Sequence, residues 1–315
     1  MNEKTRNQID EMKKQTIGVE IEMNNITRQK AAKTAATFFG TGRVEYTANR
    51  NGYYTWSAWD AQGREWKFSR DVSISGPDDE KCEMVTPILT YADIEGLQEL
   101  CRQLRRAGAK SDATRGCGVH IHIGAKGHTP QTLRNLANIM ASHESLLAEA
   151  LKLDRSRMTR YCRTVDPNFL REVNRKKPTS MASLADIWYT SQGEDYGRSQ
   201  HYNGSRYHML NLHATFTKGT VEFRLFQFDA PANGKQNGIH AGQLKSYIQL
   251  CLALSQMAKE VRTASPKPQQ NENPKYAMRT WLLRLGFIGE EFETARDILT
   301  RNLTGDAAFR HGRAA

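Results

Sequence analysis

Three short stretches of the sequence alternate ionisable residues with apolar ones. The ionisable pairs are Glu20 and Glu22 within residues 18–22, His120 and His122 within 118–124, and Glu222 and Arg224 within 220–225. Successive side chains of a β-strand point to opposite faces, so each stretch predicts a strand with an apolar face and an ionisable face. Two residues of strand separate the members of each pair by about 6.6–6.8 Å.

These residue types predict a particular chemistry when they share one face of a sheet. Carboxylates with one or two imidazoles form a hard, oxygen-rich ligand set that suits Mg²⁺ or Mn²⁺ better than structural zinc. Two further acids, Asp71 at the end of a strand and Glu83 at the start of another, extend that set. A guanidinium such as that of Arg224 binds phosphate with two parallel hydrogen bonds. Metals beside an arginine are typical of phosphoryl transfer.

The elements that must position these residues follow from periodicity and turn residues. Strands are expected at 16–24, 53–59, 64–69, 118–124, 207–216 and 220–228, and helices at 92–107, 130–153, 243–259, 276–285 and 290–303. Strands 53–59 and 64–69 flank a short glycine-containing loop, which predicts a hairpin. Strands that occur as hairpins with helices between them favour an α+β fold with a largely antiparallel sheet.

Composition narrows the class of protein. The 315 residues contain 45 Lys and Arg against 34 Asp and Glu, a formal net charge of +11, and five cysteines without a Cys-x-x-Cys pair. Scattered cysteines, odd in number, argue against a disulfide framework, and the sequence has no apolar run of about 18 residues of the kind that a membrane span needs. The N-terminus has no apolar stretch of the kind found in signal peptides. We therefore expect a soluble, reduced, cytoplasmic protein without a membrane partner.

Much of the positive charge lies in residues 152–177, which hold nine basic and three acidic residues. Such a segment predicts either a surface for phosphate, nucleic acid or an acidic substrate, or a solvated helical face. Nucleic acid is a possible partner by charge alone, because the sequence carries no recognisable nucleic-acid-binding motif.

The motifs GVEIE, WKFSRDVSI with CEMVTP, CGVHIHIG, and RYHMLNLH with GTVEFRLF occur in this order over about residues 16–260. In this order they resemble the putative amidoligase family of the carboxylate–amine ligase superfamily, which includes glutamine synthetase and glutamate–cysteine ligase. The resemblance implies a curved antiparallel sheet whose concave face binds ATP and divalent metals, Mg²⁺ or Mn²⁺. ATP would phosphorylate a substrate carboxylate, and an amine would attack the acyl phosphate to give an amide.

The same resemblance implies roles for individual residues. Metal ligands would be Glu20, His120 and Glu222 for the metal at the ATP phosphates, and Glu22, Glu83 and Asp71 for the metal near the substrates. His122 and Arg224 would contact phosphate, Arg206 would contact ATP or substrate, and Asn211, Arg157 and Arg160 would face the substrate. Arg224, Glu222 and Glu22 would be the catalytic residues. The family's Asp-Gly-Ser-Ile is Asp71-Val72-Ser73-Ile74 here, and valine tolerates a positive φ poorly.

Two other functions compete with the ligase at this stage. One is a metal-dependent hydrolase or nuclease built on the His-x-His strand and the basic segment, and the other is a non-catalytic protein with a degenerate ligase fold. The expected organisation is a tail at 1–15, a catalytic domain at 16–261, a linker at 262–275 and a helical appendage at 276–315. The sequence does not specify the carboxylate or the amine, which could be carried on a peptide, a nucleotide or a polymer.

Overall fold

The computed structural model of this chain describes residues 2–47, 52–230, 238–268 and 272–310. The chain folds into two compact units, and each is described by itself. We call residues 16–121 and 226–245 the sheet unit, and residues 1–15, 122–225 and 246–315 the helical unit.

The sheet unit contains the strands that carry most of the predicted acids. They are β1 (Ile17–Met23), β2 (Val44–Tyr46), β3 (Trp56–Trp59), β4 (Glu65–Ser69), β5 (Cys82–Val85) and the first half of β6 (Val119–Gly124). Their order is β2-β3-β4-β5-β1-β6, and β2–β3, β3–β4, β4–β5 and β5–β1 pair antiparallel. The strands expected at 16–24 and 118–124 are therefore confirmed.

The predicted hairpin is also confirmed, as β3 and β4. Its turn is fixed by Asp60, whose Oδ1 accepts hydrogen bonds from the backbone N–H groups of Gln62 (3.0 Å) and Arg64 (2.9 Å). Gly63 has a φ of +75°, which glycine adopts at no steric cost. The turn therefore sets the register between β3 and β4, in which Ser57 lies opposite Lys67.

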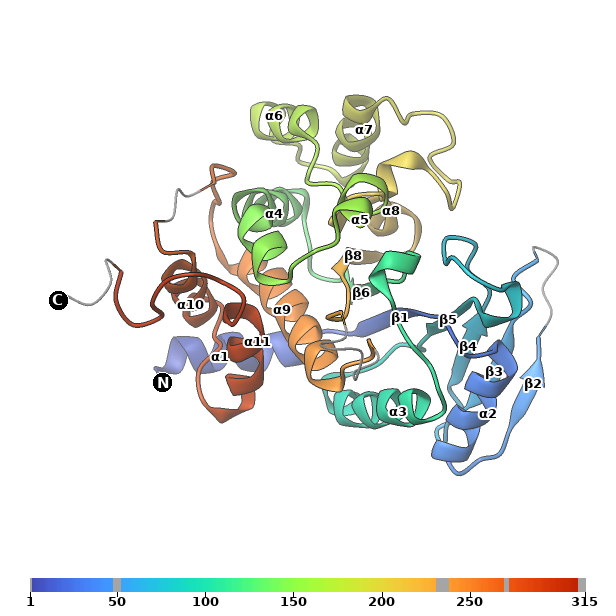
Figure 1. Ribbon diagram of the computed structural model, residues 1–315. Coiled ribbons are helices and arrows are strands. Elements are labelled where there is room, and N and C mark those ends of the chain that lie inside the picture. Colours follow the sequence, from blue (N-terminus) through green and yellow to red (C-terminus); the bar gives the residue numbers. More distant parts are fainter. Residues whose placement is uncertain (1, 48–51, 231–237, 269–271, 311–315) are drawn as a thin grey trace. The chain divides into compact units, whose positions relative to one another are not determined.

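The sheet unit also contains helices. Helix α3 (Ile94–Arg106) matches the expected helix at 92–107, whereas α2 (Arg28–Phe38) was not expected. Helix α2 packs against β3 and β4 (Figure 1). Short 3-10 turns lie at Asp78–Glu80 (η1), Tyr91–Asp93 (η2) and Ala113–Arg115 (η3).

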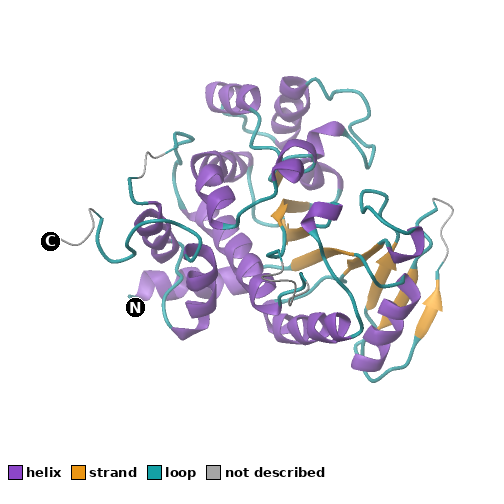
Figure 2. Cartoon of the chain, in the orientation of Figure 1, coloured by secondary structure: helices purple, strands orange, loops and turns teal. Residues whose placement is uncertain are grey.

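The helical unit consists mainly of helices, drawn in purple in Figure 2. They are α1 (Glu3–Lys13), α4 (Pro130–Ala150), α5 (Arg155–Arg160), α6 (Pro167–Lys176), α7 (Met181–Gln192), α8 (His213–Thr217), α9 (Ala241–Glu260, in this unit from residue 246), α10 (Pro274–Arg284) and α11 (Glu293–Thr300). 3-10 turns lie at Gly204–Arg206 (η4) and Glu290–Phe292 (η6). The end of β6 lies beside β8 (Thr220–Phe226), which pairs antiparallel with β7 (Leu210–Asn211).

In the helical unit most of the predicted helices are confirmed, whereas the predictions of a strand at 207–216 and of an N-terminal tail are wrong. The strand expected at 207–216 is wrong: only Leu210–Asn211 is a strand, and α8 follows at once. The residues expected as an N-terminal tail form α1. The helices expected at 130–153, 243–259, 276–285 and 290–303 correspond to α4, α9, α10 and α11. No element occupies the described residues 262–268 of the expected linker.

The observed fold is α+β with antiparallel strand pairs, as expected. Apolar residues are almost fully buried beside the ionisable residues of their own strands in each unit: Val19, Ile21 and Ile121 in the sheet unit, and Val221 and Phe223 in the helical unit. Over the described part of the chain, no helix combines the length and apolar character that a bilayer crossing needs.

Candidate active site

The sheet unit gathers four acids and one imidazole. Antiparallel pairing places Glu22 directly opposite Glu83, and residues opposite each other point to the same side of a sheet. Glu20 and Glu22 share that side because they are two residues apart on β1. Asp71 follows β4, and His120 lies on β6.

Two groups of ligand atoms in this unit are close enough to hold a cation. Glu20, Glu83 and His120 form one group, Glu22, Asp71 and Glu83 form the other, and within each group one ligand atom per residue lies within 4.8 Å of the rest. Glu83 belongs to both groups. Carboxylates this close repel one another unless a cation lies among them, and five such ligands fit Mg²⁺ or Mn²⁺.

Hydrogen bonds fix the two β1 carboxylates. Glu20 Oε2 lies 3.0 Å from His120 Nδ1, and Glu22 Oε1 lies 3.8 Å from His120 Nε2. The backbone N–H of Gly118 donates to Glu22 Oε2 at 2.5 Å. Glu22 and His120 are only 4% and 3% exposed. The side chains are therefore held in place before any ligand arrives.

Asp71 lies in a loop whose geometry the sequence left open. Val72 is not among the residues with positive φ, so valine adopts the backbone conformation of this loop without strain. The backbone N–H of Ser73 donates to Asp71 Oδ1 at 2.6 Å. This turn leaves the aspartate within reach of Glu22 and Glu83.

The helical unit holds a second ionisable cluster, and this one is buried. Glu222 Oε1 accepts a hydrogen bond from Arg224 Nη1 at 2.5 Å, and Glu222 Oε2 accepts one from Asn211 Nδ2 at 2.7 Å. Asn211 lies opposite Glu222 in the β7–β8 register. His122 Nε2 lies 3.9 Å from Glu222 Oε1, and His122 Nδ1 lies 2.9 Å from Thr220 Oγ1. Glu222 is 1% exposed, and the other predicted members are also buried.

The predicted arginines differ in their surroundings. Arg157 is buried, and its Nη2 donates to the backbone carbonyl of Arg224 at 3.3 Å, so it supports β8. Arg160 is exposed at the end of α5. Arg206 is buried between two tyrosine rings. The basic segment is therefore not one uniform surface.

Sequence reasoning missed several neighbours of these clusters. Thr220 precedes Glu222 by two residues on the same strand, so the period-two pattern could have found it. The alternation of residue types does not point to Gly118, or to Tyr207, whose ring centre lies 5.9 Å from Arg224 Cζ.

The histidines of the wrongly expected strand have depressed pKa values, because burial disfavours the charged imidazoles of His208 and His213.

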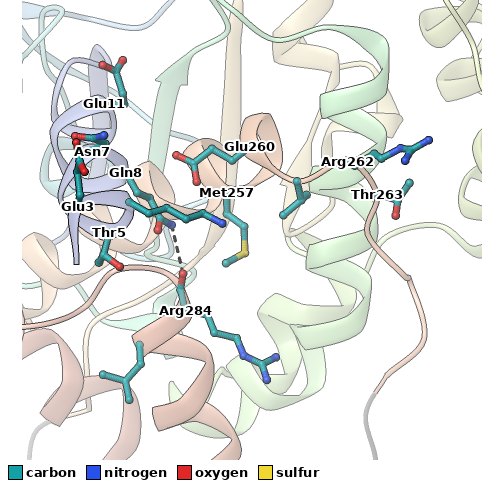
Figure 3. Close-up of a pocket in the computed structure, with 13 residues that line it drawn as sticks. Glu3, Thr5, Asn7, Gln8, Glu11, Met257, Glu260, Arg262, Thr263 and Arg284 are labelled. Carbon is teal, nitrogen blue, oxygen red and sulfur yellow. Dashed lines mark hydrogen bonds between the residues drawn. The ribbon is translucent and has the colours of Figure 1, made fainter. Parts of the chain in front are cut away.

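A separate groove of about 1,020 Å³ lies in the helical unit (Figure 3). Residues of α1, of the end of α9 and of α10 line it. Gln8 Nε2 donates to the Arg284 carbonyl across it at 3.3 Å. None of the candidate ligands described above lines this groove, so it lies apart from the predicted chemistry.

Comparison with known proteins identifies the class. Residues 13–255 match the family described as "Putative amidoligase enzyme", and the chain belongs to this family. The description of this family is that of an enzyme that forms C–N bonds.

Other comparisons are less informative. No curated protein matches the chain. Among solved structures, a bifunctional glutathione synthetase from Pasteurella multocida matches with 13% identity and a TM-score of 0.45. The match covers 96% of this chain and 49% of the synthetase, so the chain spans about half the length of that protein.

Proposed function

We propose that this enzyme is an ATP-dependent carboxylate–amine ligase with a glutamine synthetase-like curved sheet. The γ-phosphoryl group of ATP passes to a carboxylate oxygen of the first substrate, and ADP leaves. The amine nitrogen then attacks the carbonyl carbon, inorganic phosphate departs, and loss of a proton from nitrogen gives the amide. The observation that carries the proposal is the family match together with the two ionisable clusters, which are partly buried in the sheet unit and buried in the helical unit.

The sheet unit supplies most of the proposed metal ligands. Glu20 and His120 would bind a divalent metal at the ATP phosphates, and Glu22, Asp71 and Glu83 would bind one near the substrates. The donors fit this assignment, since they are oxygen-rich, close together and partly or fully buried. Bound Mg²⁺ or Mn²⁺ would offset phosphate charge and polarise the reacting oxygens.

The helical unit supplies the proposed phosphate contacts. Glu222 would be a further metal ligand, and its hydrogen bond holds the Arg224 guanidinium in one orientation. Arg224 and His122 would then donate to phosphate oxygens, stabilising charge on the transferring group. Asn211 and Arg160 would face the substrates, and Arg157 would act on them through β8.

The substrates themselves are proposed only by class. The carboxylate and the amine could each be part of a peptide, a nucleotide or a polymer, and the +11 charge favours an anionic acceptor. The family match argues against the hydrolase or nuclease alternative, because an amidoligase joins two molecules through a C–N bond, whereas a hydrolase or nuclease cleaves a bond with water.

Calorimetric binding of a non-hydrolysable ATP analogue with Mg²⁺ or Mn²⁺ tests the proposal. We compare wild type with Glu222→Gln, which keeps the side-chain shape and removes the charge. The matched control is Glu149→Gln, an exposed acid of α4. We expect metal-dependent binding in wild type and control, weakened at least tenfold in Glu222→Gln. Equal binding in all three proteins, or none in wild type, would contradict the proposal.

A further inference from the structure

The first residue of strand β8 places a hydroxyl against an imidazole of the candidate site. Thr220 Oγ1 lies 2.9 Å from His122 Nδ1. Within the residues that the structure describes, the Thr220 hydroxyl makes no other hydrogen bond to the protein. The opposite ring nitrogen, His122 Nε2, lies 3.9 Å from Glu222 Oε1. The hydroxyl therefore acts on one side of the ring, and the other side faces the ionisable cluster.

The backbone around Thr220 holds its hydroxyl in this place. The preceding turn contains Gly219, whose φ of +72° glycine adopts at no steric cost. The Gly219 carbonyl accepts the N–H of Ala125 at 2.9 Å. The Thr220 carbonyl accepts the hydroxyl of Thr215 at 3.2 Å. Because Thr220 and Glu222 are two residues apart on β8, their side chains share one face. The fold itself therefore directs the Thr220 hydroxyl toward the ring.

A hydrogen bond at one ring nitrogen determines what the other nitrogen can do. In a neutral imidazole one nitrogen donates and the other accepts. The Thr220 hydroxyl has one proton to donate, and its partner is His122 Nδ1. When the hydroxyl donates to Nδ1, the ring proton lies on Nε2. The Glu222 carboxylate favours the same arrangement, because it attracts a proton on Nε2 and repels a lone pair there.

The orientation of the ring decides whether it can hold a phosphate oxygen. Arg224 Nη1 donates to Glu222 Oε1 at 2.5 Å, so Arg224 Nη1 and His122 Nε2 both lie near this oxygen. With its proton on Nε2, His122 adds an N–H donor beside the guanidinium. A flipped ring, or one protonated at Nδ1, would present a carbon or a lone pair instead. The proposed phosphate contact therefore depends on what holds the ring.

We propose that Thr220 is a positioning residue of the ligase, whose hydroxyl holds the His122 ring so that Nε2–H points toward the transferring phosphoryl group. The inference rests on the proposed ligase function and adds to it a residue to which the family resemblance assigns no role. Thr220 acts through His122 and does not itself contact a reactant. Its hydroxyl carries the effect, whereas a structural role would depend on its size and its place in the strand.

NMR signals of the ring nitrogens in the unliganded protein give the first test. The histidines are labelled with nitrogen-15, the spectra are recorded at a pH where the ring is neutral, and His122→Leu identifies the signals. We expect an unprotonated Nδ1 in wild type, whose signal shifts in Thr220→Val because the donor is lost. The matched control, Thr215→Val, removes a hydroxyl from the Thr220 carbonyl and leaves the ring contact intact. A protonated Nδ1 in wild type, or an unchanged Nδ1 signal in Thr220→Val, would overturn the proposal.

Calorimetric binding of the non-hydrolysable ATP analogue with Mg²⁺ gives the second test. Thr220→Val should weaken binding about tenfold, as expected for the loss of one hydrogen bond to a charged group. Valine has the shape and strand preference of threonine, so the fold should be kept. Thr220→Ser, which keeps the hydroxyl, and Thr215→Val should bind the analogue as wild type does. Wild-type affinity in Thr220→Val, or an equal loss in Thr220→Ser, would contradict a role for the hydroxyl.

A double-mutant cycle then shows whether the effect passes through His122. In a His122→Leu background, Thr220→Val should weaken analogue binding no further, because the ring that the hydroxyl holds is gone. An undiminished tenfold loss in that background would show that Thr220 acts by another route and would overturn the proposal. The two proposals fail separately: absence of analogue binding in wild type contradicts the ligase, whereas binding that is insensitive to Thr220→Val contradicts the positioning role alone.

Discussion

Glu144 on α4 is a buried acid whose ionisation depends on folding. Its two carboxylate oxygens accept the backbone N–H of Val165 at 2.9 and 3.1 Å. Burial raises the pKa of Glu144 to about 7, although the Val165 hydrogen bond opposes that rise. Val165 lies two residues after Arg163, which exchanges backbone hydrogen bonds with Tyr207 and Met209. Glu144 therefore supports residues 163–165, which lie beside residues 207–209.

This raised pKa predicts a stability that decreases with pH. Between about pH 4.5 and 7 the folded carboxyl keeps its proton while the unfolded one has lost it, so folding takes up a proton. Stability from this group is greatest below pH 4.5 and is lost as pH rises to 7, by roughly 3 kcal/mol. Glu144→Gln should lose this component, which urea unfolding at pH 5 and pH 8 would measure. Glu149→Gln should keep it, and parallel curves for Glu144→Gln and wild type would contradict the prediction.

At the scale of single residues, the sequence could predict which side chains share a face of one strand, but not which residues of other strands they contact. The pairs Glu20 and Glu22, and Glu222 and Arg224, follow from the two-residue period of a strand. The approach of Glu83 to Glu22 depends on the register between β1 and β5, which neither strand specifies by itself. The burial of Arg157 depends on tertiary packing, so the charge pattern alone could not distinguish this buried arginine from the exposed Arg160.

At the scale of elements, the N-terminal cap of helix α5 stabilises a helix whose Arg157 contacts strand β8 of the candidate site. Asp154 Oδ1 accepts the backbone N–H groups of Ser156 (2.9 Å) and Arg157 (3.2 Å). A hydrogen bond from the Ser156 hydroxyl is the largest cause of the lowered pKa of Asp154. The helix is only six residues long, so its cap is a large part of its stability. Arg157 in turn donates to the backbone of β8.

Removing this cap should therefore affect both stability and binding. Asp154→Ala should cost about 1 kcal/mol of unfolding free energy and weaken binding of the metal-bound ATP analogue severalfold, because Arg157 loses its anchored position. Asp166→Ala removes the comparable cap of α6, where Asp166 accepts the Phe169 N–H at 2.8 Å, and should lower stability alone. Denaturant unfolding and calorimetry measure the two effects. If both variants bind the analogue equally well, α5 does not support the site.

There are physical reasons why helices α2 and α8 could not be predicted from the sequence. Helix α2 buries Ala31, Ala32, Ala35 and Ala36, and alanine gives a weak periodic signal. Polar and apolar residues alternate across residues 207–216, which is the pattern of a strand. The Asn211 side chain instead accepts the N–H of His213, the first residue of α8, at 2.9 Å. Asparagine competes locally with the ladder of a sheet in this way.

At the scale of the whole molecule, metal binding should change global stability. Glu22, Glu83 and Asp71 are close carboxylates, so without a cation their repulsion opposes folding. A metal that binds only the folded state adds about 2.7 kcal/mol at a concentration 100-fold above its dissociation constant. Mg²⁺ or Mn²⁺ should therefore raise the unfolding midpoint of the intact chain, and EDTA should reverse the rise.

The variant that tests this idea is Glu83→Gln, since Glu83 belongs to both acid groups of the sheet unit. Loss of its charge relieves repulsion, so the metal-free variant should unfold at a midpoint equal to or above that of wild type. The rise with metal should shrink because each group loses a carboxylate ligand. Glu95→Gln, at an exposed acid of α3, should behave as wild type in both conditions. An undiminished rise with metal in Glu83→Gln would place the metal at other ligands, and the sheet-unit carboxylates would then need a different explanation.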